Sequence, residues 1–594
     1  MKLSKIYSNK PDIFEPIDFV SGLNVVIAEI RLPENMNKDT HSLGKSTLGR
    51  LLNFCFLATR DPEFFLFKHK EQFNDFIFFL EIELNNGSYI TVKRSVKEHS
   101  KISFKKHITN KEDFSTLDKT SWDHSDMPLD RAKDILDSLL DLLTLKPWGY
   151  RNGFGYLVRS QDDFHNVFKL THHRGADSTW KPFLAQTLGF NASLITDFYN
   201  KEKELKDKQT KEFIIKSEVP KSDVDINGLL LLKRIEADQK QSFLSDFDFR
   251  GDDFETTRTL VDEIDYNIAC LNEKRYKLNK NKKKIELSLS EAKIAFSPDE
   301  AERLFKDVGV YFSGQIKNDF QQLVAFNKAI TEERNTYLQD ELVDITKEIQ
   351  SVSDELDVLG KKRSNMLSFL NSTDVFDKYK HVSDELIELR ADVQALERQS
   401  SSLQRLQELR NSIRELNEEK DKLQSKIEND VEEKNKDSNS LFSRIRINFS
   451  DIVSKVIDHK ALLSVAVNTQ GHLTFSADIL DESGSASSAG MGHTYKKLLC
   501  VAFDMAVLRA YEPTKHPKFL YHDGIFESLD DRKKENLLNV IREYSSNGLQ
   551  HIITLIDSDL PIQNDHSNVF SDQEIVLTLH DDGPSGRLFK MEQW

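Results

Sequence analysis

The sequence predicts an α/β head that is assembled from an N-terminal and a C-terminal lobe and interrupted by a long antiparallel coiled-coil arm. Three observations predict this fold class. A run typical of a phosphate-binding P-loop, Gly44-Lys45-Ser46-Thr47, lies between a strand-like and a helix-like segment. An apolar heptad pattern occupies much of the middle of the chain, and a globular composition returns from about residue 437. We expect the two globular ends to build one head around the arm.

The length and charge of the chain limit its class. Its 594 residues are too many for one core, so two or more domains are expected. Charged residues make up 30% and hydrophobic residues 38% of the chain, which is typical of a soluble protein with long exposed helices. The formal net charge of −16 argues against a globally basic nucleic-acid-binding protein, although it leaves room for a local basic groove.

The cysteines and the N-terminus indicate a cytoplasmic location. Cys55, Cys270 and Cys500 lie far apart and form no CxxC pair, so neither a zinc site nor a disulfide framework is expected. The first residues lack the apolar core of a signal peptide, and no apolar run is long enough to span a bilayer. We therefore expect no membrane partner.

The P-loop run has the flanking segments that phosphate binding requires. Residues 22–30 predict a buried strand before it, and residues 48–58 predict an amphipathic helix after it. Lys45 can place its ammonium on the β- and γ-phosphate oxygens, and the hydroxyl of Ser46 can bind Mg²⁺. One position departs from the full motif, because Asp39 stands where a glycine is usual. The alternative is a chance GKST in a surface loop.

The rest of the N-terminal lobe, expected over residues 1–190, continues as a mixed α/β structure. Residues 76–96 predict a β-hairpin around an Asn-Asn-Gly turn, and residues 131–145 predict a helix that stops before a proline. Residues 153–168 predict a strand that ends in Arg159-Ser160-Gln161.

The arm is predicted from two helical stretches of similar length. Residues 191–297 form the outgoing stretch, 298–325 a compact tip, and 326–436 the returning stretch. Leucines and isoleucines follow a period of 3.5 in the returning stretch, and Arg363 interrupts its first part. The simplest topology is one antiparallel arm with this tip at its end. The alternative is a long helical bundle, for which the sequence offers no third sustained seam.

A basic run at residues 274–284, KRYKLNKNKKK, stands out in the outgoing stretch. One interpretation is a sequence-independent contact with a phosphate backbone. The other is a solvated helix face whose lysines balance an acidic partner helix, and the sequence favours this second interpretation.

The C-terminal lobe is expected over residues 437–594. Residues 462–468 and 472–480 alternate like strands, and a loop of small residues then enters a long apolar helix that ends near 511. An apolar strand ends in His522-Asp523, and residues 550–557 predict another buried strand.

The order of these elements resembles the SMC-like, ABC-type ATPases of chromosome maintenance and double-strand-break repair. More closely, the chain is similar to the ATPases of bacterial three-component ABC systems and of the Lamassu type of anti-phage defence. The resemblance implies an ABC-type ATPase head with a long antiparallel coiled-coil arm as an insertion, and ATP and Mg²⁺ as cofactors.

The resemblance also assigns roles to individual residues. Lys45 and Ser46, with Gly44 and Thr47, match the P-loop, and Gln161 matches the Q-loop glutamine that reaches Mg²⁺ and the attacking water. Asp523 matches the Walker B aspartate and Asp530 the D-loop. The signature position, which would meet the nucleotide of a second subunit, falls on Ser488, Gly490 and Gly492. Mg²⁺ would then lie among Ser46, Gln161 and Asp523.

Three departures from that pattern concern hydrolysis. The signature is S-A-G-M-G, and Gly524 stands where the family places its catalytic glutamate. Glu527 is the nearby candidate for that role, at a different spacing. Thr554-Leu555-Ile556-Asp557 occupies the position of the usual switch histidine, and His522 is interpreted as a packed or hydrogen-bonded residue before a base. Nucleotide binding is therefore better supported than rapid hydrolysis.

The function that the resemblance implies is an ATPase that binds ATP·Mg²⁺ between two heads of a homodimer. It would sense or hold DNA without regard to sequence and would control a separate effector, such as a nuclease, together with small accessory proteins in defence against phage or plasmids. The chain itself contains no nuclease constellation. The alternatives are a DNA repair or recombination ATPase without an effector and a nucleotide-gated scaffold with little hydrolysis.

Overall fold

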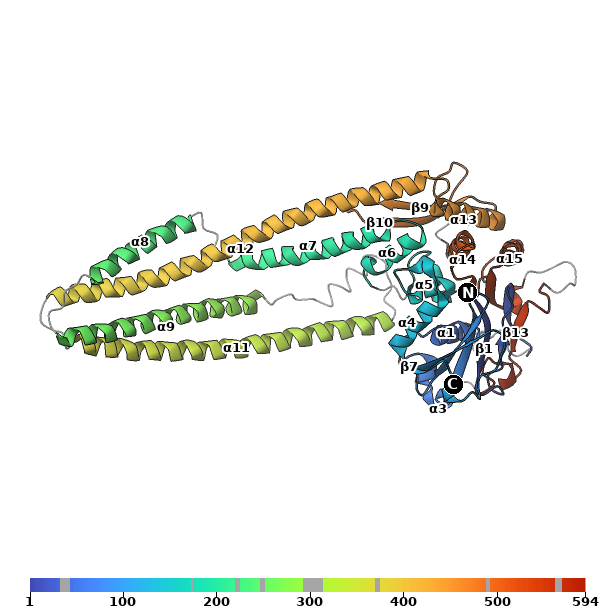
Figure 1. The fold of residues 1–594 in the computed structure, drawn as a ribbon, viewed down its shortest axis with the longest axis horizontal. Helices are drawn as coiled ribbons and strands as arrows, with labels where there is room; N and C mark the ends of the chain where they lie inside the picture. The colour runs from blue at the N-terminus through green and yellow to red at the C-terminus, as the bar shows by residue number, and fades with distance from the viewer. Residues whose placement is uncertain are drawn as a thin grey trace. The chain divides into compact units, whose positions relative to one another are not determined.

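The computed structural model describes residues 1–32, 43–171, 175–218, 225–245, 252–291, 314–368, 374–487, 492–560 and 569–592 (Figure 1). The chain divides into two compact units. Met1–Lys206 and Glu415–Trp594 together form one unit, the head, and Asp207–Arg414 form the other, the arm. The two ends of the chain therefore build one head, as predicted. The head is larger than the lobes 1–190 and 437–594 expected from the sequence, because it includes the helix segments next to them.

A parallel sheet of five strands lies at the centre of the head. Its strand order is β13-β3-β12-β11-β8, and every neighbouring pair is parallel. The strands are β3 (Leu23–Glu29), β8 (Val158–Arg159), β11 (Phe519–Asp523), β12 (Gln550–Ile556) and β13 (Ile575–His580). Strands β3 and β8 come from the N-terminal part of the chain and the other three from the C-terminal part, so neither part forms this sheet alone.

A second sheet in the head has six antiparallel strands in the order β2-β1-β4-β5-β6-β7. The strands are β1 (Lys2–Ser8), β2 (Ile17–Asp18), β4 (Ile77–Glu83), β5 (Tyr89–Ser95), β6 (Lys101–His107) and β7 (His124–Pro128). The predicted hairpin is confirmed as β4 and β5. Gly87 takes a φ of 81° in its turn, and its N–H donates to the Leu84 carbonyl at 3.0 Å.

Helices cover these sheets, and a ribbon of β9 (Ala461–Val467) and β10 (Leu473–Ile479) follows the helical insertion. The α-helices of the head outside the insertion are α1 (Lys45–Cys55), α2 (Phe65–Lys68), α3 (Lys70–Phe73), α4 (Leu129–Leu140), α5 (Tyr150–Leu157), α6 (Asp177–Thr187), α13 (Leu441–Ile457), α14 (His493–Tyr511) and α15 (Asp531–Ser546). Helix α14 is buried from Lys497 to Leu508, which is typical of a helix inside the core.

The strand predicted over residues 153–168 is wrong in its first part. Residues Tyr150–Leu157 form helix α5, and only Val158–Arg159 form a strand, after which a short 3-10 helix begins at Gln161. Tyr150, Phe154 and Leu157 are buried on one face of α5 at helical spacing. The glycines between these residues hide that period in the sequence.

The two ends of the chain share one apolar core. Phe589, near the C-terminus, is fully buried and its ring lies 5.0 Å from that of Phe73 and 5.2 Å from that of Phe14. Aromatic pairs of this kind contribute about 0.5–1.5 kcal/mol each beyond the burial of their area. The core therefore joins the lobes on both sides of the insertion.

The insertion consists of long helices: α7 (Ala192–Glu218), α8 (Ile226–Ser245), α9 (Asp252–Glu291), α11 (Gly314–Ser368) and α12 (Asp374–Lys436). Helices α7 and α12 run on from the head into the arm. Helix α9 pairs with α11 in antiparallel order, since Arg363 contacts Asp265 at 2.6 Å and Lys274 contacts Glu348 at 2.8 Å (Figure 1). The predicted antiparallel pairing of outgoing and returning stretches is confirmed by this pair.

The arm also contains contacts that a single hairpin does not predict. Helix α8 is antiparallel to α12, because Lys233 contacts Asp392 at 3.3 Å and Lys240 pairs with Glu385. Helix α9 lies against the same α12 in parallel order. Ser383 of α12 donates to Asp265 of α9 at 2.8 Å, and Arg398 of α12 pairs with Glu273 of α9.

Over this stretch a third helix joins the predicted antiparallel arm. Residues 298–313 of the expected tip lie outside the described residues, and 314–325 belong to α11. The physical reason is that heptad spacing makes a helix face apolar without choosing its partner. The polar contact of Arg363 with Asp265 and Ser383, which breaks the seam in sequence, lies where three helices meet.

Within the described part of the chain, no helix combines the length and apolar character that a membrane span requires.

Candidate functional site

The predicted P-loop run enters helix α1 as expected. Gly44 is the N-cap, with a φ of 105°, and the helix begins at Lys45. A Cβ on Gly44 would lie 2.7 Å from the Cβ of Leu588, so both the backbone angle and the space require glycine. Ser46 is exposed beside Lys45, and Thr47 follows on the same turn. Asp39, the departure from the full motif, lies outside the described residues.

Lys45 is buried, with 6% of its surface exposed, although it carries an ammonium group. Among the residues that the structure describes, its Nζ has no hydrogen-bond or ion-pair partner. Burial lowers the pKa of Lys45, and the nearby carboxylates of Asp523 and Glu527 oppose that effect. A cation in this position at a helix N-terminus is suited to an anionic ligand.

Asp523 ends strand β11 opposite Lys45 and is 1% exposed. Its Oδ1 accepts a hydrogen bond from Thr554 of the neighbouring strand β12, and its Oδ2 has no partner within the described chain. Strand β11 and helix α1 are in direct contact. The Tyr521 hydroxyl donates to the Lys45 carbonyl at 3.0 Å, and a Cβ on Gly49 would lie 2.6 Å from the Tyr521 ring.

His522 faces the other side of the sheet, because successive side chains of a strand alternate. Its Nε2 lies 3.1 Å from Asp504 Oδ2 and its Nδ1 lies 2.8 Å from His551 Nε2, all fully or almost fully buried. Asp504 also accepts two hydrogen bonds from Arg159, at 2.7 and 2.9 Å. Burial lowers the pKa of His522. The interpretation of His522 as a packed, hydrogen-bonded residue is confirmed.

The carboxylate of Glu527 lies next to Gly524, in the space that a side chain at position 524 would occupy. Gly524 has a φ of 64°, and a Cβ on it would lie 2.5 Å from Glu527 Oε1 and 2.7 Å from Gln161 Nε2. Gln161 Nε2 donates to Glu527 Oε1 at 2.8 Å, and Lys497 Nζ donates to Glu527 Oε2 at 2.9 Å. The carboxylate of Glu527 therefore occupies the space that a side chain at position 524 would enter.

A cavity of about 590 Å³ opens between these elements. Its lining brings together Ser46, Gln161 and Asp523, the three residues that the resemblance assigns to Mg²⁺. No cluster of three or more His, Cys, Asp or Glu side chains suited to a metal occurs in the described ranges. A donor set of one carboxylate with hydroxyl and amide oxygens still fits Mg²⁺, which usually keeps waters and takes further oxygens from substrate phosphates.

Gly492 and Asp530 do not line this cavity. Ser488 and Gly490 lie outside the described residues, and Gly492 is the N-cap of α14. Asp530 is the N-cap of α15, where its Oδ1 accepts from the Lys533 N–H at 3.1 Å. The hydrogen bond from the Lys533 side chain lowers the pKa of the exposed Asp530.

The arrangement of the sheet decides the fold. The strand of the P-loop and the strand of the acidic residue are separated by one parallel strand, β12, and a helical insertion divides the head. The head is thus an α/β domain whose parallel sheet takes strands from both sides of a helical arm, in agreement with the α/β head expected from the sequence.

Comparisons with known proteins give the following similarities. A family model described as "Uncharacterised protein conserved in bacteria (DUF2326)" matches residues 452–593. The solved Smc head domain with a coiled coil and joint from Pyrococcus yayanosii is 14% identical, with a TM-score of 0.35, and covers 93% of this chain and 92% of that chain. The Smc head with an extended coiled coil from Pyrococcus furiosus, bound to the C-terminal domain of ScpA, is 13% identical, with a TM-score of 0.32, and covers 94% and 90%. A search of curated proteins gives no significant match.

Sequence reasoning missed several residues of the site. Lys497 is the most important, and a lysine inside an otherwise apolar helix was the signal that could have found it. Asp557 and Asp559 lie near Lys45 at the end of β12, and burial together with the nearby Glu527 raises the pKa of Asp559. Asp557 Oδ2 accepts from the Ile30 N–H at 3.1 Å and so ties β12 to β3.

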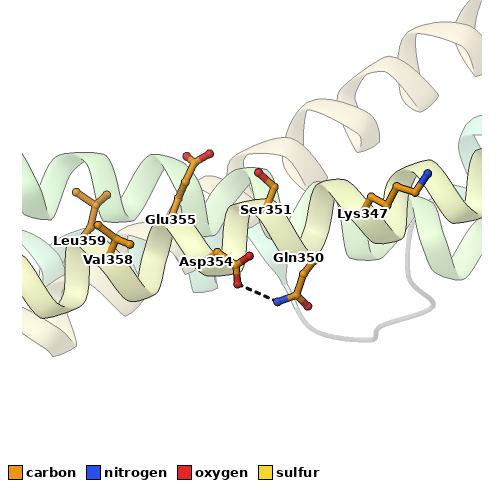
Figure 2. Close-up of a pocket in the computed structure, with 7 residues that line it drawn as sticks. All are labelled: Lys347, Gln350, Ser351, Asp354, Glu355, Val358 and Leu359. Carbon is orange, nitrogen blue, oxygen red and sulfur yellow. Dashed lines mark hydrogen bonds between the residues drawn. The ribbon is translucent and has the colours of Figure 1, made fainter.

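A second cavity, of about 650 Å³, lies on the arm and is lined by successive turns of α11 (Figure 2). Its polar groups partly satisfy one another, as in the hydrogen bond of 2.9 Å from Gln350 Nε2 to Asp354 Oδ1. A surface of mixed charge on one helix offers no converging set of reactive groups, and we assign no chemistry to it.

Proposed function

We propose that this protein is an ATPase that binds ATP·Mg²⁺ at the N-terminus of α1. One observation carries the proposal: the buried ammonium of Lys45 has no partner in the described chain and lies at a helix N-terminus opposite Asp523. Burying a cation without a partner is costly, so a site of this kind is favoured when an anion binds there. Nucleotide phosphates meet that requirement, and Gly44 allows the backbone to approach them.

Mg²⁺ would be held by Ser46, Gln161 and Asp523. The ion would neutralise charge on the phosphate oxygens. Asp523 is suited to this role because Thr554 fixes one carboxylate oxygen and leaves the other open toward the cavity. Gln161 belongs to the 3-10 helix that follows β8, so it approaches the same cavity from a different strand.

Glu527 is our candidate for the general base, in place of the glutamate that position 524 lacks. Its carboxylate is held by Gln161 and Lys497 directly over Gly524. A positioned base contributes about 10²–10⁴ to the rate of a proton-transfer step. Because the ammonium of Lys497 neutralises the charge of Glu527 in this arrangement, we expect slow basal turnover.

Two chains would form a homodimer through ATP-bound heads. Gly492 lies at the N-terminus of α14, and the preceding signature residues Ser488 and Gly490 would meet the nucleotide of the second chain. Gly492 is the N-cap of α14 and Asp530 is the N-cap of α15. In the proposed dimer both residues would lie at the interface between the heads. This part of the proposal rests on the resemblance.

DNA, an effector such as a nuclease and small accessory proteins are the proposed partners, in defence against phage or plasmids. For DNA, a groove of about 270 Å³ between α9 and α12 supports the proposal, since it is lined by Lys277, Lys280, Lys284 and Arg398. Part of the basic run is already neutralised, because Lys274 contacts Glu348 at 2.8 Å and Lys277 contacts Glu273 at 2.7 Å. Lys280, which lines the groove, forms no ion pair with described residues, and neither do Lys282 and Lys283 on the same helix, so this part of α9 keeps free positive charge.

A nucleotide-gated scaffold is the second candidate function. The contact of Lys497 with Glu527 favours it, because a neutralised base would leave the head bound to ATP with little hydrolysis. Turnover by the purified chain separates the two functions.

The proposal is tested by titrating the purified full chain with ATP and Mg²⁺ in a calorimeter. Lys45→Ala should lower ATP affinity by at least about 100-fold, because no other described cation occupies this helix terminus. Lys70→Ala, which changes an exposed lysine of the head, is the matched control and should bind ATP like the unchanged chain. Equal ATP affinity in Lys45→Ala would refute the assignment.

A further inference from the structure

Lys497 is a buried cation at the start of the apolar part of helix α14. It lies on α14, is 3% exposed and is followed by Leu498 and Leu499, which are also buried. Its Nζ donates to the Gly524 carbonyl at 2.8 Å and to Glu527 Oε2 at 2.9 Å. The same Nζ lies 5.5 Å from the centroid of the Phe164 ring. The ammonium is thus fully engaged, and one of its partners is the candidate base.

We propose that Lys497 is a positioning residue that holds Glu527 inactive until the N-terminus of α14 engages the nucleotide of a second copy of this chain. The inference rests on the proposed function and adds to it a means by which dimer formation would control hydrolysis. It assigns the control to one ion pair, the Lys497–Glu527 contact.

The position of Lys497 on α14 supports this role. The helix begins at His493, directly after Gly492, so Lys497 lies in its second turn, about 7.5 Å along the axis from the cap. A shift of the helix N-terminus by a bound nucleotide would move Lys497 together with the backbone. Helix α14 is buried from Lys497 to Leu508, whereas residues 493–496 are exposed or half-buried, so Lys497 lies where the N-terminal turn meets the packed core.

The electrostatics of the contact explain how it would restrain the base. Both oxygens of Glu527 accept a hydrogen bond, Oε1 from Gln161 and Oε2 from Lys497. A carboxylate that is paired with an ammonium is less able to take a proton from water, because protonation would break the ion pair. Withdrawal of Lys497 would free Oε2 while Gln161 still orients the carboxylate. The negative neighbours Asp557 and Asp559 would not replace the lost cation.

A purely structural role is the competing explanation. Lys497 satisfies the Gly524 carbonyl, which is buried beside β12, and its loss could loosen this turn without any effect on control. The two explanations differ in sign. A structural lysine protects activity, so its replacement lowers turnover, whereas a restraining lysine lowers basal activity, so its replacement raises turnover.

Lys497→Gln separates them, because glutamine keeps a donor for the Gly524 carbonyl and removes the charge. We would measure phosphate release and calorimetric ATP affinity in the full chain over a range of chain concentrations. The expected result is a basal rate at low concentration that is about tenfold higher, a weaker dependence of the rate on concentration, and unchanged ATP affinity. Lys497→Arg, which keeps the charge, should retain the low basal rate.

Lys496→Gln is the matched control, since it removes a neighbouring lysine of the same helix that forms no hydrogen bond or ion pair with Glu527, and it should leave the rate unchanged. Lys497→Met serves as a second uncharged variant if Lys497→Gln is unstable. A lower rate in the uncharged variants that fold, or an unaltered dependence on concentration in an active enzyme, would overturn the inference alone. ATP binding without turnover in every variant would overturn both the inference and the proposed hydrolysis. The proposed nucleotide site would still stand in that case if Lys45→Ala alone lost ATP binding.

Discussion

An ion pair of the head and an ion pair of the arm differ sharply in burial. In the head, the side chains of Arg159 and Asp504 are both 0% exposed and are joined by two hydrogen bonds. In the arm, Arg234 and Glu397 pair while 53% and 43% of their side chains are exposed. Buried pairs fix geometry because neither charge can be left alone, whereas exposed pairs exchange freely with water. The Arg159–Asp504 pair of the head therefore fixes positions in the core, whereas the Arg234–Glu397 pair of the arm contributes to solubility and helix pairing.

Arg159→Met should give the largest effect and tests this comparison directly. Removing the arginine leaves Asp504 buried beside His522, which should lower the free energy of unfolding by about 3–5 kcal/mol. Arg234→Met in the arm should cost less than about 1 kcal/mol. Urea unfolding of both variants, followed by a signal of the head, measures the difference. Similar costs for the two variants would show that burial does not separate these pairs.

Gly524 in the head and Gly360 in the arm allow the same comparison for substitutions of a backbone glycine. Gly524→Ala should lower the free energy of unfolding by about 1–3 kcal/mol, because the residue has a positive φ and its Cβ would displace Glu527 and Gln161. We also expect loss of most turnover. Gly360→Ala on α11 is the control, since a Cβ there meets nothing within 4 Å and should stabilise the helix by about 0.5–1 kcal/mol. Calorimetry and phosphate release check both, and an active Gly524→Ala would contradict the placement of the base.

Acid should destabilise the head through its buried histidines. His516 is 4% exposed, stacks on Tyr511 and has a pKa lowered to about 3 by burial. Its unfolded pKa is about 6.5, so the neutral folded form contributes stability that is complete above pH 6.5 and is lost as the pH falls toward 3. Between pH 6.5 and 5 the loss should be about 2 kcal/mol.

Urea unfolding at these two pH values measures that loss, and His516→Asn should remove most of it. A head with the same pH dependence after this substitution would show that other groups control its acid stability.

Part of this organisation could be predicted from the sequence. The P-loop helix, the hairpin at Gly87 and the strand that ends in Asp523 are local patterns, in which period and turn residues determine the element. The Lys497–Glu527 contact could not be predicted, because α14, the turn after β11 and the Gln161 segment meet only in three dimensions. Helix α5 was missed since its glycines mask a helical period.

The arm illustrates the same limit. Its helices and their breaks follow from the heptads, but the partner of each helix does not. Asp265 and Ser383 are separated by more than a hundred residues and meet Arg363 only because α9 contacts both α11 and α12. A polar residue that interrupts a seam can mark such a junction.

The smallest effect is expected from the basic groove of the arm. Lys280→Gln together with Lys283→Gln should reduce the slope of DNA affinity against salt concentration by about 1–2, if both lysines contact phosphates. Lys274→Gln, whose ammonium is already paired with Glu348, should leave the slope nearly unchanged. Fluorescence anisotropy with a short duplex at several salt concentrations measures the slopes. Equal slopes in all variants would support the solvated-face interpretation of the run.

The central claim is that Glu527 supplies the carboxylate that Gly524 cannot, and Glu527→Gln tests it most directly. The substitution keeps the size of the side chain and an acceptor for Gln161, but removes the ability to take a proton. The measurement is the fate of radiolabelled ATP in the unchanged chain and in the variant at equal occupancy. We predict equal ATP affinity, turnover lower by about 10²–10⁴, and intact ATP retained on the variant. Turnover equal to that of the unchanged chain would contradict the account.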